Sequence, residues 1–189
     1  MKVKITETLL PEVKIIEPDV FDDERGFFFE NYSTVKLAEL GITDVFIQDN
    51  HSLSRKAGTL RGLHFQLNPH AQSKIIRCSR GRILDVAVDF RAGSPTYRKW
   101  ISVELSADNF KQLYIPAGFT HGFLTLTDDT EVQYKASMYY APEFDRSVLW
   151  NDPAIGIEWG ISNPVLSAKD SSAPLLKDSD NNYTWEKDR

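Results

Sequence analysis

Short apolar runs with a period of two residues, separated by turn residues, recur along most of this chain and leave little room for helices. The clearest run covers residues 83–90. One face of a strand there carries Leu84, Val86, Val88 and Phe90, and the other carries Asp85, Ala87 and Asp89. Because successive side chains of a strand point to opposite faces, this alternation predicts an extended segment. Many such segments at short intervals favour an all-β sandwich or small barrel.

The turn residues and the alternation together delimit the expected elements. We predict strands at residues 13–16, 26–32, 45–48, 74–78, 83–90, 100–105, 112–115, 122–127, 131–140 and 155–159. One segment has helical character, with Ser33 as N-cap, Leu37 and Leu40 on one face and Gly41 as the stop. No repeat or linker divides the chain, so we expect a single domain over residues 1–189. Its polar tail, 171–189, is expected to wrap the surface or fray.

Composition narrows the class of protein. A chain of 189 residues can bury a core of its own, and a net charge of −5 gives no sign of a nucleic-acid partner. No run approaches the roughly 18 apolar residues of a membrane span, and the first residues lack the apolar core of a signal peptide. The one cysteine, Cys78, cannot form an intrachain disulfide and fits a reducing compartment. We therefore expect a cytoplasmic protein with no nucleic-acid or membrane partner.

Histidines are the first candidates for chemistry: His51, His64, His70 and His121. The cation Arg61 precedes His64 by three residues, and Lys74 follows it by ten. If the intervening loop folds back, these three side chains line one concave face. His121 follows a tight bend at Pro116 and Gly118.

Cations near these histidines suggest a pocket for a phosphate group. Arg25, Arg61 and Lys74 could supply it, arginine as a bidentate fork and lysine as a point charge.

Eight blocks of sequence carry a family resemblance. They are 23–30 (DERGFFFE), 48–52 (QDNHS), 60–66 (LRGLHFQ), 85–91 (DVAVDFR), 93–96 (GSPT), 116–123 (PAGFTHGF), 150–153 (WNDP) and 166–170 (LSAKD). In this order they resemble the dTDP-4-dehydrorhamnose 3,5-epimerase family over roughly residues 20 to 175. The resemblance implies a cupin-type jelly roll with one or two short helices. It also implies a homodimer whose N-terminal strands reach across to the partner.

The resemblance implies roles for four catalytic residues. His64 matches the general base, Asp170 the carboxylate that orients it, Tyr134 the general acid on the other face of the sugar, and Lys74 the group that holds the enolate oxygen. The substrate contacts that it implies are Arg25, Glu30, Gln48, Asn50, Arg61, His121 and Lys169. We add Tyr140, which strand alternation puts on the face of Tyr134, and Asp145, which stands where the family usually carries glutamate near the substrate.

The implied reaction inverts C3 and C5 of dTDP-4-dehydro-6-deoxy-D-glucose and gives dTDP-4-dehydro-L-rhamnose. Protons next to the C4 ketone are removed by a base tuned near neutral pH, with a cationic or hydrogen-bonding group at the ketone oxygen. A histidine paired with a carboxylate supplies such a base. No metal or cofactor is required, and the chain has no Gly-x-Gly-x-x-Gly dinucleotide loop.

Several assignments stay open at this level. Tyr139 and Tyr140 compete with Tyr134 as the acid, and Asp85 is an alternative histidine partner, for His121. Thr120 and Gly160 stand where the family more often has alanine and proline. None of these departures removes a catalytic group.

Three other functions compete with double epimerisation. A metal-dependent cupin is one, since Pro116-x-Gly118-x-x-His121 matches half of its usual pattern; the other half holds only His64 and the weak ligand Gln66. A jelly roll that binds a nucleotide sugar without chemistry is the second. An epimerase acting at C3 alone or C5 alone is the third.

Overall fold

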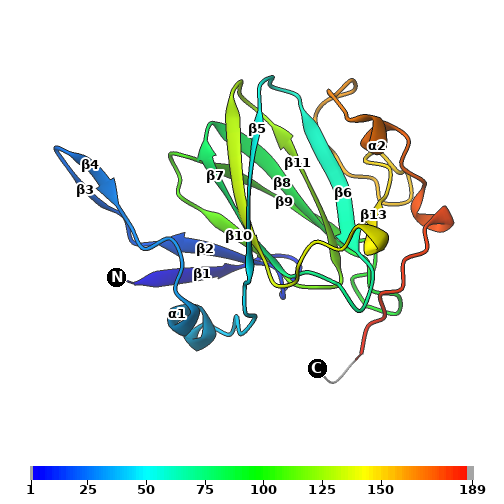
Figure 1. The fold of residues 1–189 in the computed structure, drawn as a ribbon, viewed down its shortest axis with the longest axis horizontal. Helices are drawn as coiled ribbons and strands as arrows, with labels where there is room; N and C mark the ends of the chain where they lie inside the picture. The colour runs from blue at the N-terminus through cyan, green and yellow to red at the C-terminus, as the bar shows by residue number, and fades with distance from the viewer. Residues whose placement is uncertain (1, 187–189) are drawn as a thin grey trace.

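The computed structural model describes residues 2–186 and shows two antiparallel sheets that face each other (Figure 1). The six-stranded sheet has the order β1-β2-β10-β7-β12-β5, and the five-stranded sheet has the order β13-β6-β11-β8-β9. Strands β3 and β4 form a separate hairpin that projects from the sandwich (Figure 1). The sheets stay open, so the architecture is the sandwich form of the expected jelly roll.

The strands of the six-stranded sheet are β1 (Val3–Glu7), β2 (Lys14–Pro18), β5 (Gln48–Ser54), β7 (Lys74–Arg80), β10 (Gln112–Ile115) and β12 (Thr130–Ala136). Those of the five-stranded sheet are β6 (Leu60–Gln66), β8 (Arg82–Asp89), β9 (Trp100–Ser106), β11 (Phe119–Thr125) and β13 (Asp145–Ser147). The hairpin is β3 (Phe21–Asp23) and β4 (Gly26–Phe28). The helices are α1 (Thr34–Glu39) and α2 (Ala168–Ser171), with 3₁₀ turns at Pro142–Phe144 and Leu176–Asp178.

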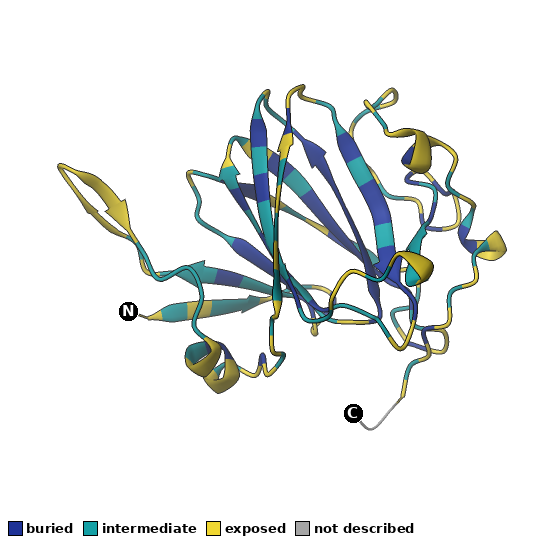
Figure 2. Cartoon of the chain, in the orientation of Figure 1, coloured by how far each residue is buried: buried dark blue, intermediate teal, exposed yellow. Residues whose placement is uncertain are grey.

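Strand β8 is buried on both faces, as the dark colour of the central strands indicates (Figure 2). The predicted apolar face packs in a cluster with the segment that follows β13, including Trp150 and Trp159. The opposite face looks into the sandwich, where Ile83 and Ala87 join a second cluster. Asp85 also lies on that inner face and is fully buried. A carboxylate that is buried so completely needs a hydrogen-bonding partner. The partner of Asp85 is His121.

Helix α1 forms as predicted. Ser33 caps it by accepting a hydrogen bond from Lys36 N, Leu37 is buried, and Gly41 follows with a φ of +81°. A left-handed residue after a helix end favours glycine. The helix covers part of the outer face of the six-stranded sheet, where Leu37 packs with Ile75 and Tyr114.

Several predicted strands differ from the observed ones. β6 was not expected because Gly62, His64 and Gln66 interrupt its apolar pattern. The expected strand at 155–159 is wrong: Ile155 and Trp159 are buried against the five-stranded sheet from an irregular segment, and Gly156 has a φ of +69°. The strand expected at 131–140 ends at Ala136.

The C-terminal tail runs over the outside of the five-stranded sheet (Figure 1). Two residues of the tail, Leu176 and Tyr183, are buried in the hydrophobic cluster on that side of the sheet. Tyr183 Oη also donates a hydrogen bond to the carbonyl of Gln66. This contact ties the described part of the tail to the end of β6. Within residues 2–186, no helix has the length and apolar character needed to cross a membrane.

Candidate active site

A histidine–carboxylate pair lies at the centre of the site. His64 Nε2 donates to Asp170 Oδ1 at 2.5 Å, and the two residues are 106 positions apart in the chain. The Asp170 side chain is 3% exposed, whereas that of His64 is 32% exposed. Burial acts to raise the pKa of the Asp170 carboxyl, but the hydrogen bond and charge of His64 outweigh it, so this pKa lies below its ordinary value. Asp170 therefore stays ionised at neutral pH and fixes the orientation of the imidazole.

An irregularity in β6 aims two of its side chains into the same cavity. Residues three apart on a regular strand point to opposite faces, but the β6–β11 register shifts between His121 and Phe123. As a result Arg61 and His64 both line the cavity. Gly62 makes this possible: its φ is +138°, and a Cβ there would lie 2.6 Å from the Cα of Gly122.

Helix α2 delivers Asp170 to the cavity. Ser167 caps the helix, its Oγ accepting from Asp170 N at 3.0 Å. A parallel bridge between Thr59 and Val165 holds the preceding segment against the start of β6. The capping role of Ser167 was missed, although a serine three residues before an acidic residue is a recognised signal for a helix start.

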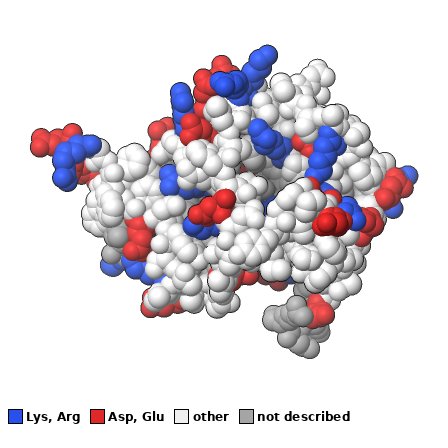
Figure 3. All heavy atoms as spheres, viewed as in Figure 1, with Lys and Arg blue, Asp and Glu red and all other residues white. Residues whose placement is uncertain are grey.

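The cavity between the sheets measures about 420 Å³. Its walls include the predicted residues Arg61, His64, Lys74, His121, Tyr134, Lys169 and Asp170. The expectation that Arg61, His64 and Lys74 share a concave face is thus confirmed. Basic and acidic side chains are mixed over the end of the sandwich that carries β5, β6 and α2 (Figure 3). The excess of cations lies in the cavity wall itself, where Arg61, Lys74 and Lys169 stand against the carboxylate of Asp170, so this mildly acidic protein contains a locally basic cavity.

The six-stranded sheet contributes Lys74 and Tyr134 to the opposite wall. They lie on the adjacent strands β7 and β12, with Lys74 Nζ 6.0 Å from the centroid of the Tyr134 ring. Burial lowers the pKa of Lys74 to about 8. Burial raises the pKa of the Tyr134 phenol, and the negative charge of Asp145 raises it further. At neutral pH the cavity thus holds a cation and a neutral phenol side by side.

A second histidine–carboxylate pair lies directly beside the first. His121 stands opposite His64 in the β11–β6 register, and its Nε2 donates to Asp85 Oδ1 at 2.6 Å. This pair is almost fully buried, with side-chain exposures of 9% and 0%. The alternative partner considered for His121 is therefore correct. Asp85 Oδ2 has no hydrogen-bond partner among residues 2–186.

A side branch of the cavity, about 230 Å³, extends past Lys74 toward Tyr140 and Asp145. Asp145 Oδ2 accepts from Tyr140 Oη at 3.1 Å and from Lys169 Nζ at 2.5 Å. Tyr140 lies beyond the end of β12, so strand alternation does not place it. Its backbone N–H instead donates to Gln48 Oε1, and the carboxamide of Gln66 binds the backbone of Tyr139 and Ala141.

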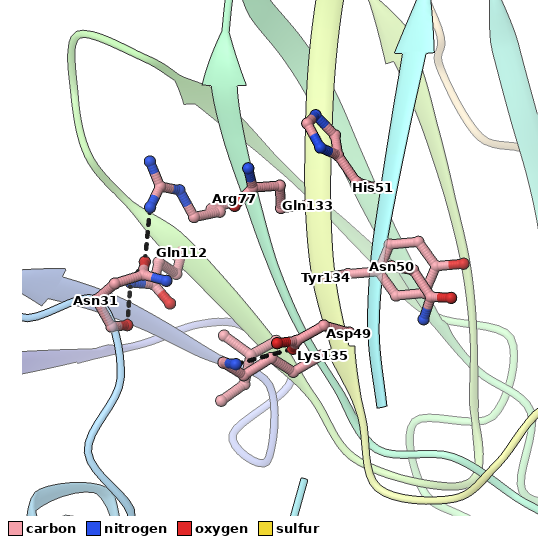
Figure 4. A pocket seen from close by; sticks show the side chains of 10 residues that line it. Asn31, Asp49, Asn50, His51, Arg77, Gln112, Gln133, Tyr134 and Lys135 are labelled. Atoms are coloured by element: carbon pink, nitrogen blue, oxygen red, sulfur yellow. Dashed lines mark hydrogen bonds and ion pairs between the residues drawn. The ribbon is translucent and has the colours of Figure 1, made fainter. Parts of the chain in front are cut away.

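Gln48 and Asn50 connect this branch with the outer face of the six-stranded sheet. Gln48 Nε2 donates to Asn50 Oδ1, and the buried Asn50 Nδ2 has no hydrogen-bond partner within the described part of the chain. Asn50 and Tyr134 point away from Arg77 and Gln133 (Figure 4). All four line a smaller cavity of about 170 Å³, and this cavity shares Tyr134 with the main one.

Four predicted residues, Arg25, Glu30, Gln48 and Asn50, do not line the cavity or its side branch in their own chain. Arg25 sits at the tip of the projecting hairpin and pairs with Asp23. Glu30 pairs with Lys36 on α1.

The metal-cupin alternative would need three or four nitrogen or carboxylate ligands around one point. Over residues 2–186, no group of three or more His, Cys, Asp and Glu side chains is arranged to hold a metal ion.

Comparison with known proteins places these features in a family context. Residues 7–178 match the family model described as dTDP-4-dehydrorhamnose 3,5-epimerase. The chain is 55% identical over 174 residues to the dTDP-4-dehydrorhamnose 3,5-epimerase of Salmonella typhimurium, covering 91% of this chain and 94% of that one.

Two solved structures are similar along nearly their whole length. A dTDP-4-dehydrorhamnose 3,5-epimerase from Bacillus anthracis, with TDP and PPi bound, is 50% identical with a TM-score of 0.90, covering 92% of this chain and 99% of that one. A dTDP-6-deoxy-D-glucose-3,5-epimerase from Legionella pneumophila, in complex with dTDP-4-keto-L-rhamnose, is 44% identical with a TM-score of 0.93, covering 97% and 99%.

Proposed function

This chain belongs to the dTDP-4-dehydrorhamnose 3,5-epimerase family, and from that membership we propose that it converts dTDP-4-dehydro-6-deoxy-D-glucose into dTDP-4-dehydro-L-rhamnose. The observation that carries the proposal is that a histidine base and a phenol approach one cavity from facing sheets. His64 comes from the five-stranded sheet and Tyr134 from the six-stranded sheet, and both line the same space. Inversion at carbon requires proton removal on one face of the sugar and delivery on the other. We expect the protein to work in the cytoplasm, where nucleotide sugars are available to it.

Proton removal is the task of His64. Asp170 fixes its imidazole through the 2.5 Å hydrogen bond and stabilises the imidazolium that forms. The electron pair left on C3 or C5 moves into the C4 ketone and gives an enolate. Lys74 holds the enolate oxygen, and a cation in a buried site stabilises that charge more strongly than water does. Tyr134 then donates its proton to the carbon from the opposite face.

Several side chains of the same cavity suit the nucleotide diphosphate. Arg61 and Lys169 are positive groups at the walls, and arginine matches phosphate through paired N–H donors. Outside this cavity, Asn50 stands opposite Tyr134 in the β12–β5 register, and its Nδ2, which has no partner among residues 2–186, offers a further donor. His121 lies beside His64 at the cavity wall and is held in place by Asp85.

Completion of the site by a second copy explains the projecting hairpin. Phe21, Phe27 and Phe28 on it are 55–65% exposed, and a two-stranded hairpin is at best marginally stable by itself. Exposed apolar groups of this kind mark contact surfaces. We infer a homodimer in which the hairpin of each copy and the residues that directly follow it bring Arg25 and Glu30 to the cavity of the other.

Mixing two inactive variants tests this shared site. We expect Arg25→Ala and His64→Ala each to be inactive as homodimers and to recover activity when mixed and allowed to reassociate. The mixed dimer has one cavity with His64 from one copy and Arg25 from the other. Absence of any recovery, with exchange of subunits verified by mass spectrometry, would contradict the shared site.

The stereochemical outcome is tested by trapping the product. After incubation with dTDP-4-dehydro-6-deoxy-D-glucose, borohydride reduction and hydrolysis release the sugar for chromatography. Double inversion yields 6-deoxy-L-mannose and 6-deoxy-L-talose. Inversion at C3 alone yields 6-deoxyallose and 6-deoxygulose, and only 6-deoxyglucose and 6-deoxygalactose remain if the protein merely binds the sugar.

Activity is expected to fall as the pH rises through about 8. Lys74 carries its positive charge below its pKa, and burial lowers this pKa to about 8, so the cation at the enolate oxygen is lost above that pH. The pKa of Tyr134 is raised, so the phenol does not ionise in this range. The measurement is kcat/KM against pH. In Lys74→Arg the alkaline fall should disappear from the range up to about pH 10, because arginine stays protonated.

A further inference from the structure

The surroundings of Lys74 decide whether it keeps the positive charge that the proposed reaction needs. Its ammonium lies in both branches of the cavity, where His64, Tyr134 and Lys169 are shared walls. Burial acts against the positive charge there. Something in the surroundings must therefore favour the charged form.

The titratable and charged groups around Lys74 come from every element packed against it. The carboxylates are Asp85 on β8, Asp145 on β13 and Asp170 on α2. The cations and imidazoles are Arg61 and His64 on β6, His121 on β11 and Lys169 on α2. The phenols are Tyr134 on β12 and Tyr140 beyond its end.

Two of the three carboxylates are already committed to histidines. Asp85 and Asp170 hold His121 and His64 and are buried at 0% and 3% side-chain exposure. Asp145 differs, because its Oδ2 is held by Lys169 and Tyr140 at the wall of the side branch and its side chain is 19% exposed. Of these three carboxylates, Asp145 is therefore the one that is not hydrogen-bonded to a histidine.

We propose that Asp145 is a positioning residue that maintains the positive charge of Lys74, and that Lys169 opposes it as a paired counter-charge. The inference rests on the role proposed above for Lys74. Asp145 and Lys169 line the same branch of the cavity as Lys74, so the carboxylate of Asp145 favours the charged form of Lys74 and the like charge of Lys169 disfavours it. The position of Asp145 is set by the backbone: β13 pairs with β6, Asp145 opposite Gln66. A residue on a paired strand presents its charge at a fixed place.

Two substitutions should move the alkaline fall of kcat/KM in opposite directions. Asp145→Asn removes the negative charge at nearly constant shape and should move the fall about one pH unit lower. Lys169→Met removes a like charge and should move it to higher pH. Asp145→Glu keeps the charge and should retain the wild-type midpoint. These midpoints are independent of how far the substitutions weaken substrate binding.

A titration without substrate separates this inference from the proposed reaction. ¹⁵N-lysine NMR, with the Lys74 signal assigned from Lys74→Met, reports the Lys74 pKa directly. The inference holds if Asp145→Asn lowers that pKa and Lys169→Met raises it, even if the wild-type protein acts on another sugar. An unchanged Lys74 pKa in Asp145→Asn, with the fold verified by circular dichroism, would overturn it.

Discussion

Replacing His64 by alanine should lower turnover by about 10³-fold or more and stop hydrogen exchange at both C3 and C5. General-base catalysis contributes about 10²–10⁴-fold, and the two titratable groups that neighbour His64 on its own side of the cavity are already bound to other side chains. Asp170 is buried and committed to His64, while His121 is held by the buried Asp85. The measurement is the rate of deuterium incorporation into the substrate in deuterated buffer, at each carbon separately.

His121→Ala is the matched control for this variant. It removes the neighbouring imidazole of the same sheet, opposite His64 in the register, and should weaken substrate binding while leaving detectable exchange. The account is contradicted if His64→Ala exchanges at the wild-type rate, or if His121→Ala alone stops exchange with substrate still bound.

Replacing Tyr134 by phenylalanine should reduce inversion far more than exchange. Enolate formation needs His64 and Lys74 only, so protons still leave and return on the His64 side. Delivery on the other face needs the phenol, whose raised pKa keeps it protonated. We expect a loss of about 10²–10⁴-fold in inversion and a much smaller loss in exchange, measured together by NMR.

Tyr139→Phe and Tyr140→Phe are the controls for the competing assignments. Tyr140 Oη donates to Asp145 and its ring is 57% exposed, and Tyr139 is 67% exposed. Neither tyrosine lines the main cavity. Any loss of activity in these two variants should therefore lower the rates of inversion and of exchange by the same factor. If Tyr134→Phe lost both in equal proportion, its role would be binding rather than proton delivery.

The sandwich architecture and part of the strand pattern could be predicted from local sequence. The strand at 112–115 and the helix capped by Ser33 match the structure because turn residues and caps act locally. β6 could not be predicted by alternation, since its irregularity at Gly62 changes which side chains point inward. At residues 155–159 the apolar pattern predicts a strand that the structure does not contain. Its apolar residues are buried because an irregular segment of chain there covers the five-stranded sheet.

The site itself depended on contacts that no local pattern contains. His64 and Asp170 meet across 106 residues through α2, and only the resemblance of whole blocks connected them. Tyr140 shows the limit of strand reasoning: it lies near Tyr134 because Gln48 and Gln66 hold the segment after β12, not because the strand continues. Arg25 and Glu30 lie away from the cavity of their own chain, so the structure of one chain does not test the substrate contacts predicted for them.

The most direct measurement for the central claim is proton NMR of dTDP-4-dehydro-6-deoxy-D-glucose incubated with the protein in deuterated buffer. The account predicts that deuterium enters both C3 and C5, with the coupling pattern of the inverted sugar at each carbon. Label at one carbon alone would contradict double epimerisation and leave a single-site epimerase. No label at either carbon would contradict proton abstraction by His64 from this sugar.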